Sequence, residues 1–119
     1  MRILIADDDA QDCAVLSNFL SRKGHYVRTV DRGTDALEVA PVFRPQVVFL
    51  DLCIPELDGW GVCERLRVSK HAEHAIIFAL TTNAATEYAS RCRHARFDAY
   101  LVKPVELDLA GRLVHCSSQ

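Results

Sequence analysis

The sequence predicts an α/β fold built as a doubly wound, five-stranded parallel sheet. Five short apolar runs alternate with five segments of helical character along the 119 residues, which is the pattern of parallel strands joined by helical crossovers. The first, third and fourth runs are almost entirely apolar, as in strands that helices cover on both faces. Five such units are too few for an eight-fold barrel. We therefore expect one domain over residues 1–119.

The predicted strands are short and rich in Ile, Val, Leu and Phe. They are RILIA (2–6), HYVRTV (25–30), QVVFL (46–50), AIIFAL (75–80) and AYLV (99–102). The second run is more polar than the others, which suits a strand at the edge of the sheet.

The predicted helices fall between these runs. The first carries apolar residues at helical spacing between Cys13 and Leu20, and Gly24 supplies its stop. In the second, Thr34 is a candidate N-cap, and Pro41 and Pro45 should end the helix. The remaining helices are expected over 59–70, 85–95 and 106–116. In the first of these three, Val62, Leu66 and Cys63 should face the core.

The composition is that of an ordinary globular protein. Half of the residues are apolar and the formal net charge is −2, so we expect neither a nucleic acid nor a membrane as partner. No apolar run approaches the roughly 20 residues needed to span a bilayer, and the start lacks a signal-peptide pattern, so the expected location is the cytoplasm. The five scattered cysteines indicate reduced thiols. Zinc binding by His71, His74 and Cys63 lacks a complete ligand set.

Polar residues follow four of the apolar runs. Asp7, Asp8 and Asp9 come directly after the first run and Asp51 after the third. The other polar residues at strand ends are Thr81, Thr82 and Lys103. The carboxyl ends of parallel strands meet at one edge of a doubly wound sheet, where ligands bind near a topological switch point. We therefore expect a cluster of carboxylates, hydroxyls and an ammonium at that edge.

Phosphoryl transfer is the chemistry that this set of groups suits. Clustered carboxylates repel one another unless a divalent cation neutralises them, and Mg²⁺ prefers oxygen ligands. A carboxylate can also be the nucleophile that forms an aspartyl-phosphate. A lysine and a hydroxyl would stabilise the phosphoryl oxygens. The sequence therefore predicts a Mg²⁺-dependent phosphoryl site.

Four motifs together resemble the receiver domain of two-component response regulators, including the chemotaxis regulators. They are ILIADDDA, VVFLDLCIPELDGW, IIFALTTNA and AYLVKP, in that order. The resemblance extends from residue 2 to about 115 and implies a flavodoxin-like three-layer sandwich with strand order 2-1-3-4-5. It also implies phosphorylation by a sensor histidine kinase or a histidine phosphotransfer protein.

The resemblance implies roles at the acidic positions. Asp51 resembles the phosphoacceptor of the family. Asp7 and Asp8 look like its acidic pair for Mg²⁺, with Asp8 as the more direct ligand, and Asp51 and the backbone carbonyl of Cys53 would be further ligands. Asp9 is then a solvated acid or a helix N-cap.

Three other positions match the residues that complete a receiver site. Lys103 corresponds to the lysine that contacts the phosphoryl group, and Thr81 to the switch hydroxyl that follows it. Tyr100 occupies the position of the aromatic switch residue, whose ring turns inward in the active state. In this family the bond between residues 103 and 104 is cis, which an X-Pro bond tolerates. Asp58 matches the turn after the phosphoacceptor and should cap the following helix rather than bind metal.

Three positions depart from the pattern of the family. Arg96 stands where a glycine is common, so it would carry a left-handed backbone or force another turn. Thr82 replaces a small residue beside the site, and Val105 replaces a frequent aromatic residue. Neither Arg96 nor Val105 touches the phosphorylation chemistry.

The expected function is a signalling switch that accepts a phosphoryl group on Asp51 with Mg²⁺ and is not an enzyme acting on a separate substrate. Its downstream protein target would dock on the face formed by 85–95, 99–102 and 106–116. A receiver-fold scaffold that is never phosphorylated remains open as an alternative. A Mg²⁺-dependent phosphatase with an aspartate nucleophile would need a second aspartate two residues after the first, where this chain has Cys53.

Overall fold

The computed structural model describes residues 1–82, 91–92 and 94–117, and they form a five-stranded parallel sheet with strand order β2-β1-β3-β4-β5. The strands are β1 (Arg2–Ala6), β2 (Tyr26–Val30), β3 (Val47–Asp51), β4 (Ile76–Thr81) and β5 (Ala99–Val102). The helices are α1 (Ala10–Arg22), α2 (Gly33–Phe43), α3 (Gly59–Arg67) and α5 (Leu107–Ser117). The predicted fold class and strand order are confirmed. The helix expected over 85–95 lies mostly outside the described residues.

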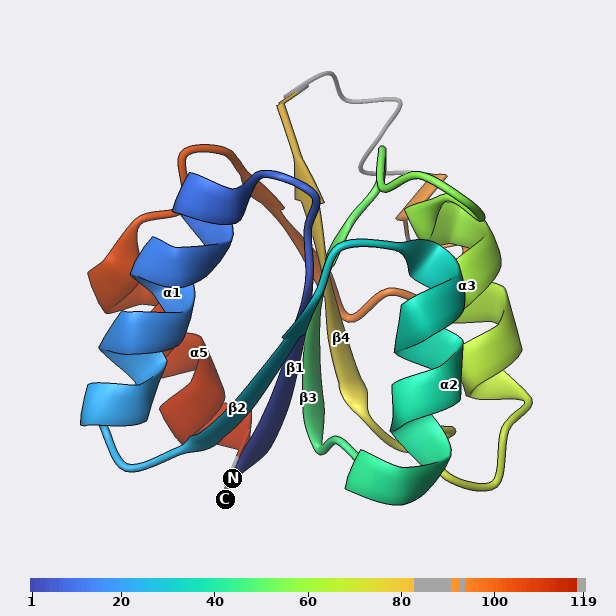
Figure 1. The fold of residues 1–119 in the computed structure, drawn as a ribbon, viewed down its shortest axis with the longest axis horizontal. Helices are drawn as coiled ribbons and strands as arrows, with labels where there is room; N and C mark the ends of the chain where they lie inside the picture. Colours follow the sequence, from blue (N-terminus) through green and yellow to red (C-terminus); the bar gives the residue numbers. More distant parts are fainter. Residues whose placement is uncertain (83–90, 93, 118–119) are drawn as a thin grey trace.

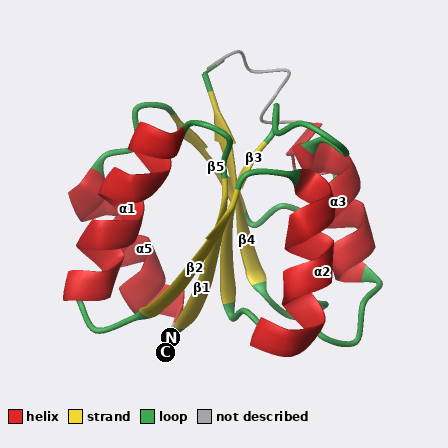
Figure 2. Ribbon diagram, in the orientation of Figure 1, coloured by secondary structure: helices red, strands yellow, loops and turns green. Residues whose placement is uncertain are grey.

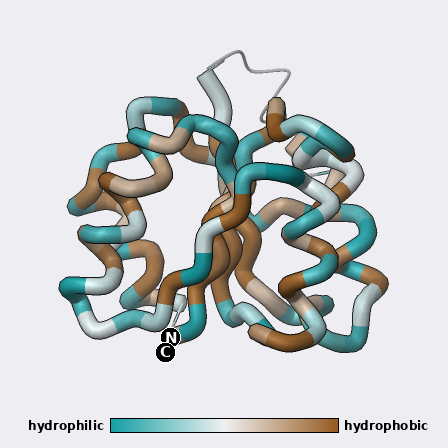
Figure 3. The backbone as a smooth tube through the Cα atoms, in the orientation of Figure 1, coloured by the Kyte–Doolittle hydropathy of each residue, from teal (hydrophilic) through white to brown (hydrophobic). Residues whose placement is uncertain are grey.

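The sheet is covered on both faces, as its apolar central strands require. Helices α1 and α5 lie on one face and α2 and α3 on the other (Figure 1, Figure 2). Alternate residues of β1 and β3 enter two separate cores, with Leu4 and Val48 facing α2 and α3, and Ile3 and Phe49 facing α1 and α5. The brown central strands in Figure 3 show this apolar interior. Strand β2 forms an edge, as predicted, and its Tyr26 is 74 % exposed.

Helix α1 begins and ends at the residues that its sequence signals indicate. The Asp9 carboxylate accepts hydrogen bonds from the N–H groups of Gln11 and Asp12, so Asp9 is the N-cap. Gly24 follows the helix with a φ of 93°, a conformation that a residue without Cβ adopts at little cost. Of the two interpretations of Asp9, the capping role is therefore the one that the structure shows.

Replacing Asp9 by alanine should destabilise the fold by about 1 kcal/mol, because two N–H groups at the start of α1 lose their acceptor. Urea unfolding followed by circular dichroism measures this change. Asp9→Asn is the matched control and should lose only a few tenths of a kcal/mol, since asparagine caps equally well. Equal losses in both variants would show that the carboxylate charge, and not capping, stabilises this end.

Helix α2 differs from the prediction in its N-cap, and it ends at Phe43, between the two prolines that were expected to stop it. Its N-cap is Arg32 and not Thr34, because the loop after β3 caps it from outside: the carbonyls of Pro55 and Glu56 accept from the N–H groups of Gly33 and Thr34 at 3.0 and 3.1 Å. The helix also continues through Pro41. It closes only where the N–H of Arg44, at a left-handed φ of 52°, donates to Ala40.

Helix α3 begins at its predicted residue and ends three residues early. Asp58 caps it through the N–H of Gly61, as expected. Val62, Cys63 and Leu66 are fully buried on its inner face, also as expected. The helix ends at Arg67 and not at residue 70, because the N–H of Ser69 closes a tighter turn onto the Leu66 carbonyl at 3.1 Å.

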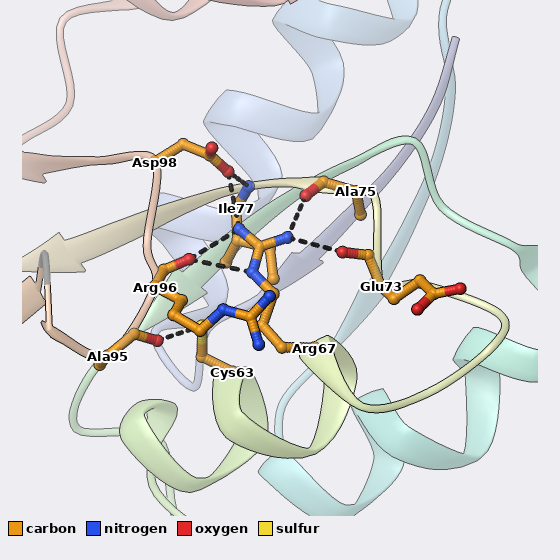
Figure 4. Close-up of polar contacts among 8 residues, drawn as sticks. All are labelled: Cys63, Arg67, Glu73, Ala75, Ile77, Ala95, Arg96 and Asp98. Carbon is orange, nitrogen blue, oxygen red and sulfur yellow. Dashed lines mark hydrogen bonds and ion pairs between the residues drawn. The ribbon is translucent and has the colours of Figure 1, made fainter.

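The buried Arg67 ties the end of α3 to three neighbouring segments (Figure 4). Its guanidinium donates to the Arg96 carbonyl at 2.9 and 2.7 Å and to the Asp98 carboxylate at 2.8 Å. It also donates to the carbonyls of Glu73 and Ala75, and Asp98 in turn accepts from the N–H of Ile77 at 2.7 Å. Arg96 has a φ of 69°, so of the two alternatives for this non-glycine residue, a left-handed backbone or another turn, the structure shows the left-handed backbone.

Both ends of the described chain lie at the edge of the sheet where the parallel strands begin. Met1 and Ser117 line one cleft of about 420 Å³ there. No helix among the described residues has the length and apolar character to cross a membrane.

Candidate functional site

The acidic residues after β1 have different environments. Asp7 is buried, with its N–H donating to the Val30 carbonyl of the neighbouring strand at 3.0 Å. Its carboxylate accepts from the N–H of Asp9 at 2.9 Å. Asp8 is exposed. One acid is therefore held inside the fold, and the next is accessible to solvent.

Asp51 is the last residue of the central strand β3, where it pairs with Leu80 of β4. Only 6 % of it is exposed, and its carboxylate accepts from the N–H of Cys53 at 2.9 Å. The following loop folds tightly over the strand end, so that a Cβ on Gly59 would lie 2.6 Å from the Asp51 carbonyl. Only glycine fits there without moving the backbone that holds Asp51.

Lys103 joins the two buried acids. Its ammonium lies 2.8 Å from Asp7 and 2.9 Å from Asp51, and its side chain is 12 % exposed. Its own N–H donates to the Thr81 carbonyl at 2.7 Å, next to the cis bond between Lys103 and Pro104. The predicted cis bond is thus present, and β5 delivers Lys103 to the acids of β1 and β3.

Burial and pairing act in opposite directions on these charges. Burial lowers the pKa of Lys103, but its hydrogen bonds to Asp7 and then to Asp51 outweigh this, so the pKa lies above the ordinary value. Burial raises the pKa of Asp7 by more than its hydrogen bond to Lys103 lowers it. Because the ammonium and both carboxylates are in direct contact, Lys103 carries its charge at every physiological pH.

The three predicted acids form a group suited to a hard cation. Oxygens of Asp7, Asp8 and Asp51 all lie within 4.8 Å of one another. These carboxylates face one ammonium, so a divalent cation would balance the negative charge that remains. Oxygen is the donor atom that Mg²⁺ prefers, and the donor set therefore fits that ion.

The zinc alternative has no such group within the part of the chain that the structure describes. Cys63 is fully buried and its thiol donates to the Ala95 carbonyl, while burial raises the pKa of that thiol to about 11. A protonated thiol is a poor metal ligand. All five cysteines lie among the described residues, and all are free thiols, as predicted.

The remaining predicted residues lie close to the same edge. Thr81 is buried at the end of β4, one residue beyond the register partner of Asp51. Tyr100 is half-buried on β5 and packs against the core that α2 and α3 cover. The side chain of Cys53 is exposed in the loop after β3. Thr82 is exposed, and Val105 is half-buried against the core on the α1 and α5 side.

One charged neighbour was not among the predicted site residues. The Asp12 carboxylate of α1 lies 3.9 Å from the Lys103 ammonium. The sequence signal for Asp12 is its place in the first turn of α1, directly after the acidic run. Helical side chains tilt toward the N-terminus of their helix, so this carboxylate lies near the acids that precede α1. Lys103 therefore has three carboxylates within 4 Å, and Asp8 lies beside two of them.

A parallel α/β sheet with acids and a lysine at its carboxyl edge is the architecture of a signalling domain of the two-component class. The family model of the response regulator receiver domain matches residues 3–113. The chain therefore belongs to the response regulator receiver domain family.

Two relatives carry a similar region as part of a longer protein. The chain is 36% identical over 105 residues to the probable transcriptional regulator ycf27 of Guillardia theta, covering 87% of this chain and 39% of that protein. It is 31% identical to the sensor histidine kinase RcsC of Escherichia coli K12, covering 92% of this chain and 11% of the relative. The chain thus spans less than half the length of both proteins.

A solved structure shares the fold. It is the receiver domain of the sensor histidine kinase PA1611 from Pseudomonas aeruginosa PAO1, with a magnesium ion coordinated in its active site cleft. The TM-score is 0.89 and the identity 26%, and the match covers 99% of this chain and 98% of the other.

Proposed function

We propose that this domain is a phosphorylation-controlled switch that accepts a phosphoryl group on Asp51. The observation that carries the proposal is the contact of the Lys103 ammonium with Asp51 inside a cluster of acids. This arrangement places a nucleophilic carboxylate beside a fixed cation that can stabilise phosphoryl oxygens. The domain acts as a switch between two states and not as an enzyme with a separate substrate.

The transfer itself needs only one bond to form and one to break. An oxygen of the Asp51 carboxylate attacks phosphorus, and the bond from phosphorus to the donor nitrogen of a phosphohistidine breaks, with its electron pair passing to the imidazole. The N–H of Cys53 fixes the orientation of the carboxylate. Lys103 lies where its ammonium can move from the Asp51 carboxylate to the arriving phosphoryl oxygens.

Asp7, Asp8 and Asp51, with the backbone carbonyl of Cys53, would hold Mg²⁺ in this proposal. The ion would neutralise the acids and the phosphoryl oxygens. The carboxylate oxygens within 4.8 Å of one another support this assignment, as does the magnesium ion in the related PA1611 domain. Asp8, which is exposed, would be reached first by the hydrated ion, whereas Asp7 is already paired with Lys103.

Thr81 and Tyr100 would transmit the change. The Thr81 hydroxyl would follow the phosphoryl group, and the Tyr100 ring would turn further into the core that it already contacts. The donor would be a histidine kinase or a phosphotransfer protein. The downstream target would dock on the face formed by β5, α5 and the segment 85–95, of which a large part lies outside the described residues.

Incubation with acetyl phosphate and Mg²⁺ should add one phosphoryl group to the protein, and removal of the divalent cation with EDTA should abolish the gain. Without the cation, the clustered carboxylates repel an anionic donor. Intact mass spectrometry measures the gain, and adding excess Mg²⁺ back should restore it. No gain with Mg²⁺ would reject the proposed switch and favour a scaffold, whereas an equal gain in EDTA would reject the metal site alone.

A further inference from the structure

The ammonium of Lys103 faces a third acid besides its two buried partners. We propose that Asp12 is a positioning residue, which holds Lys103 toward α1 and adds a negative charge that slows phosphorylation of Asp51. This inference rests on the proposed function of Asp51. A residue in the first turn of α1 would then set how fast Asp51 is phosphorylated.

The position of Asp12 is fixed by the backbone around it. Its N–H donates to the Asp9 carboxylate at 3.0 Å, so the cap of α1 also orients the residue that approaches Lys103. The Asp12 carboxylate is 3.9 Å from the ammonium, a longer contact than those of Asp7 and Asp51. Its side chain is 46% exposed, so a donor approaching from solvent meets this charge before the buried acids.

Lys103 has space on the Asp12 side. A cavity of about 150 Å³ lies between α1 and the start of α5, and both Asp12 and Lys103 line it. Its other walls are mainly apolar, from Leu16, Val105 and Leu107. The ammonium therefore has room to shift toward Asp12, and Asp12 is the lining acid nearest to solvent.

Two physical effects follow, and both act in the same direction. Asp12 competes with the phosphoryl oxygens for the one ammonium, because an attraction to Asp12 must weaken as Lys103 turns to the phosphoryl group. Asp12 also repels the anionic donor, although water and salt screen this repulsion at a half-exposed carboxylate. Removing the charge should therefore speed phosphorylation without changing the nucleophile.

The test compares the parent with Asp12→Asn, which keeps the size and the backbone contacts of the side chain but removes its charge. At saturating Mg²⁺, the rate constant for phosphorylation by acetyl phosphate should rise about two- to fivefold, as expected for a screened interaction between charges several ångströms apart. The increase should shrink at 1 M salt and with phosphoramidate, a donor of smaller negative charge. Neither dependence would follow from a purely structural effect.

Two further variants complete the experiment. Asp12→Glu restores the charge and should return the rate toward the parent. Asp108→Asn removes an exposed acid from the first turn of α5 and should leave the rate unchanged. A rate equal to the parent in Asp12→Asn, or the same increase at all salt concentrations, would overturn the role of Asp12. Failure of the parent itself to gain a phosphoryl group would instead reject the proposed function.

Discussion

Replacing Asp51 by asparagine should abolish the Mg²⁺-dependent phosphoryl gain completely. The amide has nearly the shape of the carboxylate, but it is uncharged and a far weaker nucleophile. It also removes one of the three clustered carboxylates and one of the two short contacts of Lys103. Intact mass after incubation with acetyl phosphate and Mg²⁺ measures the effect directly.

The matched control for this experiment is Asp58→Asn, in the loop that follows Asp51. Asp58 caps α3 through the N–H of Gly61, and asparagine caps as well as aspartate. This variant should be phosphorylated like the parent. An equal mass gain in Asp51→Asn would show that another residue accepts the phosphoryl group and would remove the basis for assigning Asp51.

Replacing Arg67 by alanine should lower the free energy of unfolding by about 3 kcal/mol, because it removes a buried charge together with its partners. This is the largest loss of stability that we expect from a single substitution. The guanidinium is 8% exposed and donates to the carbonyls of Arg96, Ala75 and Glu73 and to the Asp98 carboxylate. Alanine leaves these acceptors with fewer partners in the interior. Asp98 is 40% exposed and can recover water, which keeps the loss at the lower end of the range for buried pairs.

Urea unfolding measures this loss, and Arg65→Ala is its control. Arg65 occupies the same last turn of α3 but is exposed, so its replacement should change stability by less than about 0.5 kcal/mol. Arg67→Lys should recover little of the lost stability, because a single ammonium cannot reproduce the planar guanidinium that donates to both the Arg96 carbonyl and the Asp98 carboxylate. A loss below about 1 kcal/mol in Arg67→Ala would contradict a stabilising role for this network.

The sheet was predictable because its central strands β1, β3 and β4 are buried on both faces and their sequences are almost entirely apolar. A fully apolar run such as VVFL, between Gln46 and Asp51, is typical of a parallel strand that helices cover on both faces. The cluster of Asp7, Asp8, Asp51 and Lys103 was predictable for a related reason, since each follows or ends an apolar run and parallel strands bring such positions to one edge.

The features that the sequence did not reveal depend on contacts between distant segments. The cap of α2 comes from the carbonyls of Pro55 and Glu56, so the local preference of Thr34 for an N-cap loses to tertiary structure. Arg67 looks like a surface residue at the end of an amphipathic helix. Its carbonyl acceptors come from the left-handed turn at Arg96 and from the loop before β4, and the sequence pattern does not show either contact. Asp12 similarly acquires a partner only through the fold.

Met1 and Ser117, the two ends of the described chain, share a cleft at the edge of the sheet opposite the acids. This placement allows the domain to be combined with other sequences. Other sequences can be joined at either of these ends, or the whole domain inserted within a longer chain, without covering the cluster of acids. The relatives fit this principle, because the matching region makes up 39% of one and 11% of another. One receiver domain can thus form part of proteins of very different size.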